Sequence, residues 1–367
     1  MNVAPLFAPF TLGTLRLDNR IVMAPMTRTF SPDGIPGPDV AAYYRRRAEG
    51  GVGLIITEGT YVPHPGSGFD ARVPHLYGEE SLAGWRRVVE EVHTAGGRIF
   101  PQLWHVGIVY GPGQGTPAEG LMAFGPSGLR KPGEQVTEPM SQTDINAVIE
   151  AFATAASNAK ALGFDGLELH GAHGYLLDQF FWEGTNRRTD GYGGDLVSRT
   201  RFAVEIIQEV RRRIGPDFPL AFRFSQWKLQ DFEAKLARTP AELEAFLRPL
   251  CDAGVDLFHC STRRFWQPEF EGSDLNLAGW TKKLIGKPTV TVGSVTLNED
   301  MMKSFSGDDA ASVTGIDDLL DRLGRGEFDL VAVGRSLIVN PEWAHSVRSG
   351  NLNTLLPFSR TALAQLI

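Results

Sequence analysis

The chain has 367 residues, of which 42% are hydrophobic, and 36 basic and 43 acidic residues give it a formal net charge of −7. An acidic protein attracts neither nucleic acid nor an anionic membrane surface, so we expect neither as a partner. No segment has the apolar length of a membrane-spanning helix, and the N-terminal stretch lacks the basic region of a secretory signal. Cys251 and Cys260 are too few for a disulfide framework or for a zinc or iron–sulfur site. We therefore expect a cytoplasmic protein.

From the N-terminus, residues 6–19 predict a small β-hairpin that closes the bottom of the fold. Short apolar or β-branched runs then alternate eight times with helical segments. This alternation predicts a parallel sheet covered by helices, and favours a (β/α)₈ TIM barrel over an open doubly wound sheet. The predicted strands are residues 20–25, 52–59, 98–105, 165–171, 219–225, 256–261, 288–293 and 329–335. The predicted helices are residues 40–49, 79–95, 143–162, 198–214, 239–253 and 340–349, with less regular segments near 278–285 and 316–323.

Local signals refine this pattern. The sequence TPAE at residues 239–242 is a capping box with proline at the first helical position, which predicts a helix start. Residues 106–140, after the third strand, are rich in glycine and proline and too long for an ordinary connection, which predicts a lid or a pocket wall. The glycine cluster at 111–115 lacks the spacing of a dinucleotide-binding motif and is expected to be a loop. No linker is evident, so we expect residues 1–367 to form one domain.

Polar residues and glycines gather where the predicted strands end, which is where barrel enzymes place their chemistry. The glycines after the last two strands favour a phosphate cradle, and Arg335 would add a charged contact. A phosphate site, an amide from Gln102 and a buried Arg223 together indicate flavin mononucleotide (FMN). In strand order, the strand-end residues are Ala24 to Thr27, Glu58 and Gly59, Gln102 and Trp104, His170 with His173 and Tyr175 on its loop, Arg223, Ser261, Gly293 and Ser294, and Gly334 and Arg335.

Six stretches in the same order resemble the Old Yellow Enzyme family of FMN-dependent ene-reductases, from Leu6 to about Glu342. They are NRIVMAPMTR (19–28), ITEGT (56–60), QLWHVG (102–107), ELHGAHGYLLDQFF (168–181), TNRRTDGYGG (185–194) and VAVGRSLIVNP (331–341). The resemblance implies a TIM barrel that binds FMN and takes hydride from NADPH or NADH. It also implies reduction of activated C=C bonds in enones by a ping-pong cycle in which both substrates use one pocket.

The resemblance also implies roles for individual residues. Around the isoalloxazine ring it places the backbone at Pro25 and Met26, the Thr27 hydroxyl at O4, Gly59, Gln102 at the pyrimidine edge, and Arg223 near N1 and O2. At the phosphate it places Gly293, Ser294, Gly334 and Arg335. At the substrate it places His170 and His173 on the carbonyl oxygen, Tyr175 as proton donor, and Trp104. Yeast-type members have Asn where His173 stands. Residues 261–270 and those after Glu342 match no part of the family pattern.

The histidine pair admits three interpretations. A metal site would need further ligands, and Glu168 and Asp178 are weak candidates. A purely structural pair is disfavoured because glycine-flanked histidines at a strand end are poorly placed to fill a core. A donor cluster fits best, because imidazole N–H groups polarise an enone carbonyl and a tyrosine can then protonate the α-carbon. Two alternatives to an ene-reductase stay open: a metal-dependent barrel hydrolase, and a flavin-binding protein without this activity. The sequence is consistent with a monomer or a homo-oligomer.

Overall fold

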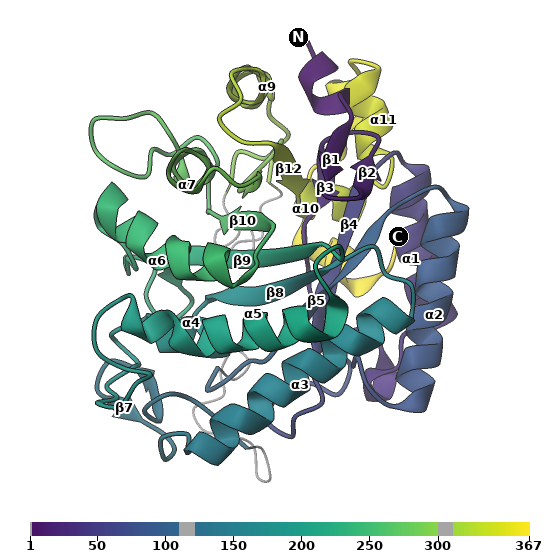
Figure 1. The fold of residues 1–367 in the computed structure, drawn as a ribbon. Coiled ribbons are helices and arrows are strands. Elements are labelled where there is room, and N and C mark those ends of the chain that lie inside the picture. The colour runs from purple at the N-terminus through teal and green to yellow at the C-terminus, as the bar shows by residue number, and fades with distance from the viewer. Residues whose placement is uncertain (1, 110–121, 300–310) are drawn as a thin grey trace.

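The computed structural model describes residues 2–109, 122–299 and 311–367. Eight strands, all paired in parallel, close into a barrel in the order β10-β11-β12-β3-β4-β5-β8-β9, which confirms the predicted (β/α)₈ architecture (Figure 1). All eight predicted strands are present. They are β3 (Ile21–Met23), β4 (Leu54–Tyr61), β5 (Ile99–Trp104), β8 (Leu167–His173), β9 (Leu220–Lys228), β10 (Leu257–Ser261), β11 (Thr289–Val292) and β12 (Leu330–Val333).

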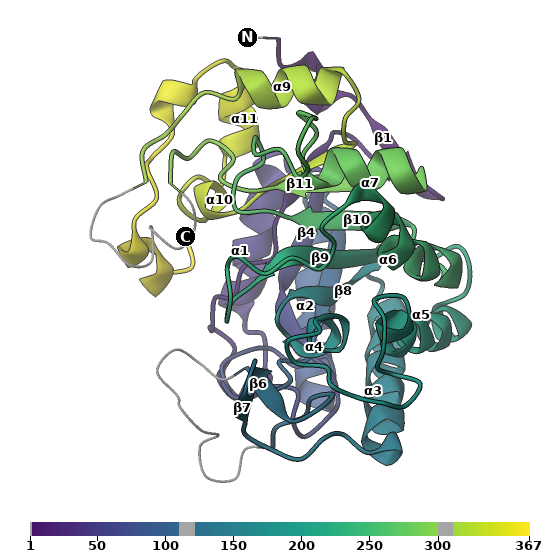
Figure 2. The ribbon, with the colours of Figure 1, turned by 90° about the vertical axis from the view of Figure 1, so that its left-hand side faces the viewer.

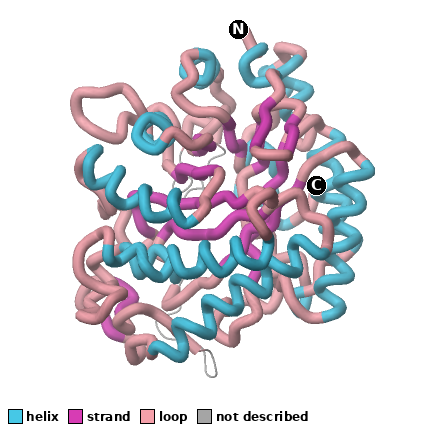
Figure 3. The backbone as a smooth tube through the Cα atoms, in the orientation of Figure 1, coloured by secondary structure: helices cyan, strands magenta, loops and turns pink. Residues whose placement is uncertain are grey.

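Helices surround this barrel on its outer face (Figure 3). The Thr239 side chain caps α6 by accepting the Glu242 N–H, as predicted, but the Glu242 carboxylate accepts from Arg238 N–H rather than from Thr239. The helices are α1 (Pro38–Glu49), α2 (Glu79–Thr94), α3 (Gln142–Ala161), α4 (Leu176–Phe181), α5 (Arg201–Ile214), α6 (Pro240–Ala253), α7 (Leu277–Ile285), α9 (Asp317–Gly324), α10 (Arg335–Val339) and α11 (Trp343–Arg348).

The predicted start of the last helix, at residue 340, is wrong. Helix α10 begins directly after β12 and ends at Val339, and α11 begins only at Trp343. Pro341 lies between the two helices. Proline has no N–H and disfavours a helical conformation of the residue before it, and Asn340 is indeed non-helical, with φ of −128° and ψ of 80°, so the helix is interrupted here.

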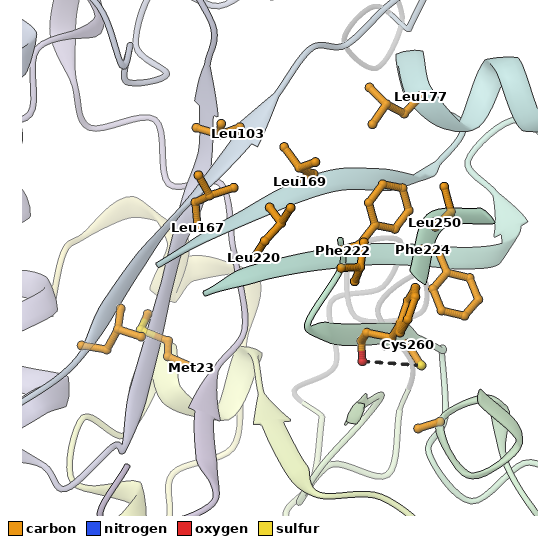
Figure 4. Packing of buried hydrophobic residues seen from close by; sticks show 14 of the residues in the cluster. Met23, Leu103, Leu167, Leu169, Leu177, Leu220, Phe222, Phe224, Leu250 and Cys260 are labelled. Carbon is orange, nitrogen blue, oxygen red and sulfur yellow. Dashed lines mark hydrogen bonds between the residues drawn. The ribbon is translucent and has the colours of Figure 1, made fainter. Parts of the chain in front are cut away.

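Alternation along the strands separates the interior of the barrel from the layer under the helices. On β8, Leu167 and Leu169 pack outward into the large apolar core (Figure 4), whereas Glu168 and His170 alternate with them. On β9, Phe222 likewise points outward. Side chains at every second position of a strand share one face, so polar groups on neighbouring strands meet inside the barrel.

The predicted N-terminal hairpin is confirmed. Strands β1 (Phe10–Leu12) and β2 (Leu15–Leu17) pair antiparallel. Their leucines pack with interior residues such as Leu54 and Leu257 from the starts of barrel strands. The hairpin therefore closes the end of the barrel opposite to the strand ends that carry the polar residues.

The long connection after β5 contains β6 (Leu129–Lys131) and β7 (Glu134–Gln135), which pair antiparallel and lie far from α9 (Figure 2). The glycine cluster at 111–115 lies outside the described residues. No helix in the described parts of the chain combines the length and the apolar character needed to cross a membrane.

Candidate active site

A cavity of about 350 Å³ opens at the carboxyl-terminal ends of the barrel strands. All the residues predicted from the strand ends and from the family resemblance line this cavity except Glu58, whose carboxylate instead accepts from the backbone of Arg28 and Thr29. The predicted cavity residues come from all eight strands or the loops that follow them. These residues are Ala24, Pro25, Met26, Thr27, Gly59, Gln102, Trp104, His170, His173, Tyr175, Arg223, Ser261, Gly293, Ser294, Gly334 and Arg335. The closed parallel barrel brings them together because all its strands end on one side.

His170 lies near the end of β8, buried, with a defined tautomer. Its Nδ1 accepts a hydrogen bond from the Ala172 N–H at 3.3 Å. Burial lowers the pKa of His170 well below its usual range, and the positive charge of Arg223 lowers it further. The ring is therefore neutral, and because Nδ1 is an acceptor, the proton is on Nε2.

His173 ends the same strand in the left-handed region, with φ of +65°. Its backbone N–H donates to Ser225 Oγ at 2.9 Å, and its ring stacks on Trp227 with 4.6 Å between centroids. Its Nε2 lies 2.7 Å from Ser261 Oγ. Burial and the charge of Arg223 lower the pKa of His173 well below its usual range. Both imidazoles are consequently neutral hydrogen-bonding groups at pH 7.

Tyr175 and Trp104 form the aromatic side of the cavity. The Tyr175 ring meets Trp104 and His170 edge to face, with 5.0 Å between centroids in each pair. Burial raises the pKa of Tyr175 to about 12, so the phenol keeps its proton at neutral pH. A side chain at position 59 would place its Cβ 2.5 Å from the Trp104 ring, which explains the glycine there.

Arg223 and Gln102 form a polar wall of the cavity. Arg223 Nη2 donates to Ser261 Oγ at 3.3 Å, while its Nε is buried without a hydrogen-bond partner among the described residues. Gln102 is also buried, and its Nε2 donates to Glu168 Oε1 at 2.7 Å. A buried guanidinium nitrogen without a partner costs free energy unless a ligand or water satisfies it.

The far end of the cavity is built from the loops after β11 and β12. Gly293 has φ of +144°, and a Cβ there would lie 2.8 Å from the Thr262 carbonyl oxygen, so only glycine fits. Ser294 also has a positive φ, of +50°. Arg335 Nη2 lies 3.3 Å from Ser294 Oγ and donates to the Glu299 carbonyl at 2.6 Å.

Several cavity residues were not predicted from the sequence: Trp227, Leu229, Phe232, Thr262, Arg263 and Leu363. Thr262 and Arg263 belong to the 261–270 segment, for which the motifs gave no family counterpart, and Leu363 belongs to the C-terminal segment. A further buried polar residue, His259, was also missed, and its alternation with the predicted Ser261 on β10 was the available signal. In contrast, the described residues of the 106–140 connection do not line this cavity. The lid stays a prediction.

Glu168 and Asp178, the weak candidates for metal ligands, have other partners in the fold. Asp178 forms a 2.7 Å ion pair with Lys228, both fully buried. Glu168 bonds Gln102 and His259. Within residues 2–109, 122–299 and 311–367, no three His, Cys, Asp or Glu side chains gather in a group that could hold a metal ion.

Comparison with known proteins places the chain in a family. Residues 5–353 match the NADH:flavin oxidoreductase / NADH oxidase family. An NADH oxidase from Thermoanaerobacter brockii is 36% identical over 361 residues, which cover 95% of this chain and 52% of that protein. 12-oxophytodienoate reductase 2 from Arabidopsis thaliana is 32% identical over 352 residues, covering 92% of this chain and 87% of that protein. The structure of morphinone reductase in complex with tetrahydroNAD superposes with a TM-score of 0.79 at 29% identity, covering 98% of this chain and 93% of that chain.

The chain belongs to the NADH:flavin oxidoreductase / NADH oxidase family, that of Old Yellow Enzyme, which confirms the resemblance drawn from its motifs. It spans about half the length of the Thermoanaerobacter relative.

Proposed function

We propose that the protein is an FMN-dependent oxidoreductase that uses NADH or NADPH to reduce the activated C=C bond of α,β-unsaturated carbonyl compounds. The observation that carries this proposal is the donor arrangement at one cavity: two neutral imidazoles and a protonated phenol. Family membership supports the flavin and the nicotinamide donor. We also propose that residues 1–367 act as one domain, since β3 and β12, from opposite ends of the chain, are neighbours in the barrel.

The cavity fits FMN. Arg223 Nε is a buried donor nitrogen of a cationic side chain, and it has no hydrogen-bond partner among the described residues. This is expected for a group that faces N1 and O2 of the isoalloxazine ring. Gly59 lines the same cavity, and its lack of a side chain lets the Trp104 ring pack against it. We assign the pyrimidine edge to Gln102. The remaining assignments are Pro25, Met26 and Thr27 along the ring, and Gly293, Ser294, Gly334 and Arg335 at the phosphate.

When bound, FMN supplies hydride transfer from the nicotinamide to the β-carbon of the alkene. The protein supplies the polar groups. His170 donates Nε2–H to the carbonyl oxygen of the enone, and His173 donates from the other side. These hydrogen bonds strengthen as negative charge develops on that oxygen. Tyr175 then gives its proton to the α-carbon, which its pKa of about 12 allows because the phenol is protonated when the substrate arrives.

Ser261 sets the tautomer that His173 needs. The Ser261 oxygen accepts from Arg223 Nη2, and its hydroxyl can then donate to His173 Nε2. With Nε2 as the acceptor, the proton of the neutral ring is on Nδ1, which is left for the substrate. Ser261→Ala should therefore raise the KM for an enone while flavin reduction by NADPH keeps its rate. An unchanged KM in steady-state assays would refute this assignment.

Three measurements test the proposed function. The purified protein should be yellow, and denaturing it should release a flavin that co-migrates with FMN. Without oxygen, it should oxidise NADH or NADPH only when an enone such as cyclohexenone is added. A colourless protein with bound zinc would favour the hydrolase alternative. A yellow protein that leaves the enone unchanged would favour a flavoprotein without ene-reductase activity.

A further inference from the structure

A second polar layer lies behind the Gln102 side chain. Glu168 accepts from Gln102 Nε2 through Oε1 at 2.7 Å, and its Oε2 lies 2.7 Å from His259 Nδ1. Glu168 and His259 are fully buried, and neither lines the cavity. Their hydrogen bonds reach the cavity through the Gln102 amide, while the charge of Glu168 also acts on Arg223, whose pKa it raises against the effect of burial.

The barrel register explains how these side chains meet. Gln102 on β5 and Glu168 on β8 are direct partners across neighbouring strands. On the other side of Glu168, its partner on β9 is Ala221, which carries only a methyl group. A side chain from β10, the next strand, can therefore reach the carboxylate over Ala221, and His259 does so.

The protons in this layer can be assigned from its chemistry. Burial lowers the pKa of His259, so the ring is neutral, and Nδ1–H is the donor that a carboxylate oxygen requires. His259 Nε2 is buried without a partner within the described part of the chain. Both groups that touch the Glu168 carboxyl group donate to it, Gln102 through Nε2 and His259 through Nδ1. The Gln102 amide must turn its NH₂ toward Glu168 and its carbonyl oxygen away from it.

We propose that Glu168, held in place by His259, is a positioning residue that fixes the Gln102 amide so that its carbonyl oxygen accepts the N3–H of FMN. This inference rests on the proposed function, because it takes FMN as the cofactor and Gln102 as its pyrimidine contact. N3–H is the one donor on that edge of the ring, between two carbonyl acceptors. A reversed amide would set NH₂ against N3–H, donor against donor. Without its acceptor in Glu168, the amide would lose the contact that prevents this reversal.

A double-mutant cycle tests whether Glu168 acts through Gln102. The apo-protein is titrated with FMN, and quenching of flavin fluorescence gives the Kd. Glu168→Leu should weaken FMN binding about five- to ten-fold, the value of roughly one hydrogen bond. Gln102→Leu should weaken it to a similar extent. The combined variant should bind FMN no more weakly than Gln102→Leu alone. Additive losses would mean that Glu168 acts by another route and would overturn the inference.

The conservative variant Glu168→Gln provides a rescue. Its amide oxygen can still accept from Gln102, and its NH₂ can face His259 if the ring moves its proton from Nδ1 to the unpartnered Nε2. Near wild-type FMN affinity is therefore expected. Binding as weak as in Glu168→Leu would show that the charge, rather than the amide orientation, is what FMN requires, and would also overturn the inference.

A spectroscopic readout separates positioning from a general structural role. FMN labelled with nitrogen-15 at N3 reports the N3–H proton by NMR in the bound state. Its signal should move upfield in Glu168→Leu and stay in place in Glu168→Gln. Glu58→Gln is the matched control, because Glu58 is also a buried carboxylate, but among the described residues its partners are the backbone N–H groups of Arg28 and Thr29. Its effect on FMN affinity should be additive with Gln102→Leu.

Two further outcomes are distinguishable. If Glu168→Leu does not fold, as judged by circular dichroism, Glu168→Leu combined with His259→Phe replaces the buried polar pair by an apolar one and enters the same cycle. If the wild-type protein binds no FMN, the proposed function fails. If it binds FMN but the cycle is additive, only the role of Glu168 fails.

Discussion

Tyr175→Phe removes one hydroxyl from the cavity and leaves the aromatic packing unchanged. The ring keeps its edge-to-face contacts with Trp104 and His170, so the fold and the flavin site should survive. If Tyr175 is the general acid, its loss should slow alkene reduction about 10²–10⁴-fold, equivalent to roughly 2.7–5.4 kcal/mol of activation free energy. Flavin reduction by NADPH requires no proton from this group and should keep its rate.

Anaerobic stopped-flow absorbance of the flavin measures the two half-reactions separately. With cyclohexenone, the oxidative half-reaction should be strongly slowed in the variant. Quinones and nitroalkenes should be affected less, because solvent can protonate their stabilised anions. In the wild type, the oxidative rate should stay level up to about pH 10, since burial raises the pKa of Tyr175 to about 12. Equal slowing of both half-reactions would refute the reasoning, because it would mean that Tyr175 positions the ring instead of donating a proton.

Other perturbations give equally defined results. The His170→Ala/His173→Ala double variant should bind phenols far more weakly, as measured by phenol titration, with little change in FMN affinity. The activation free energy of enone reduction, measured from kcat, should rise by about 2.7–4 kcal/mol for each lost donor. Equal losses of phenol and FMN affinity would contradict the donor role. Lys228→Met leaves the buried Asp178 without its ion-pair partner and should lower the free energy of unfolding, measured in urea, by about 3–5 kcal/mol. Adding Asp178→Leu should restore most of this stability, and a double variant as unstable as Lys228→Met would contradict pairing as the cause. The free energy of unfolding should also fall between pH 7 and 5. Six histidines have pKa values lowered in the fold, so the unfolded chain binds more protons below about pH 6.5, at up to about 1.4 kcal/mol per pH unit for each buried ring. Glu58, with its pKa raised to about 7, contributes one proton in the opposite direction. Urea titrations in which the free energy of unfolding rises from pH 7 toward pH 5 would refute this prediction.

Much of the site could be predicted because a closed parallel barrel converts position along the chain into position in space. Once the barrel is recognised, a residue near a predicted strand end that faces inward, such as His170 or Arg223, is expected at the same side of the barrel as its counterparts on the other strands. The alternation of side chains along each strand then decides which of them face inward. The same rule would have placed His259 inside, between Leu257 and Ser261, had each strand been followed over its whole length and not only at its end.

The remaining cavity wall could not be predicted, since long-range contacts determine it. Leu363 reaches the cavity because the C-terminal segment folds back over the barrel. Arg28 Nη2 donates to the backbone carbonyl of Gln365 at 2.7 Å and lies 3.4 Å from those of Ala362 and Leu363. These bonds join residues more than 330 positions apart, through carbonyl groups that every residue has. No local periodicity encodes such a contact.

Arg223 connects the electrostatics of the whole site. Its positive charge lowers the pKa of both His170 and His173, in addition to burial, and so keeps them neutral. The same charge lowers the pKa of Tyr175, but burial outweighs it, and the phenol stays protonated. Arg223 therefore places a positive charge close to these three groups, at the position proposed for N1 and O2 of FMN, in a cavity that Arg263 and Arg335 also line. The groups proposed to face the substrate are uncharged donors. Under the proposed function, charge that develops on the enone oxygen would meet donors that are already in place. The proton needed at the α-carbon would be held by Tyr175, which is too weakly acidic to lose it before the substrate arrives.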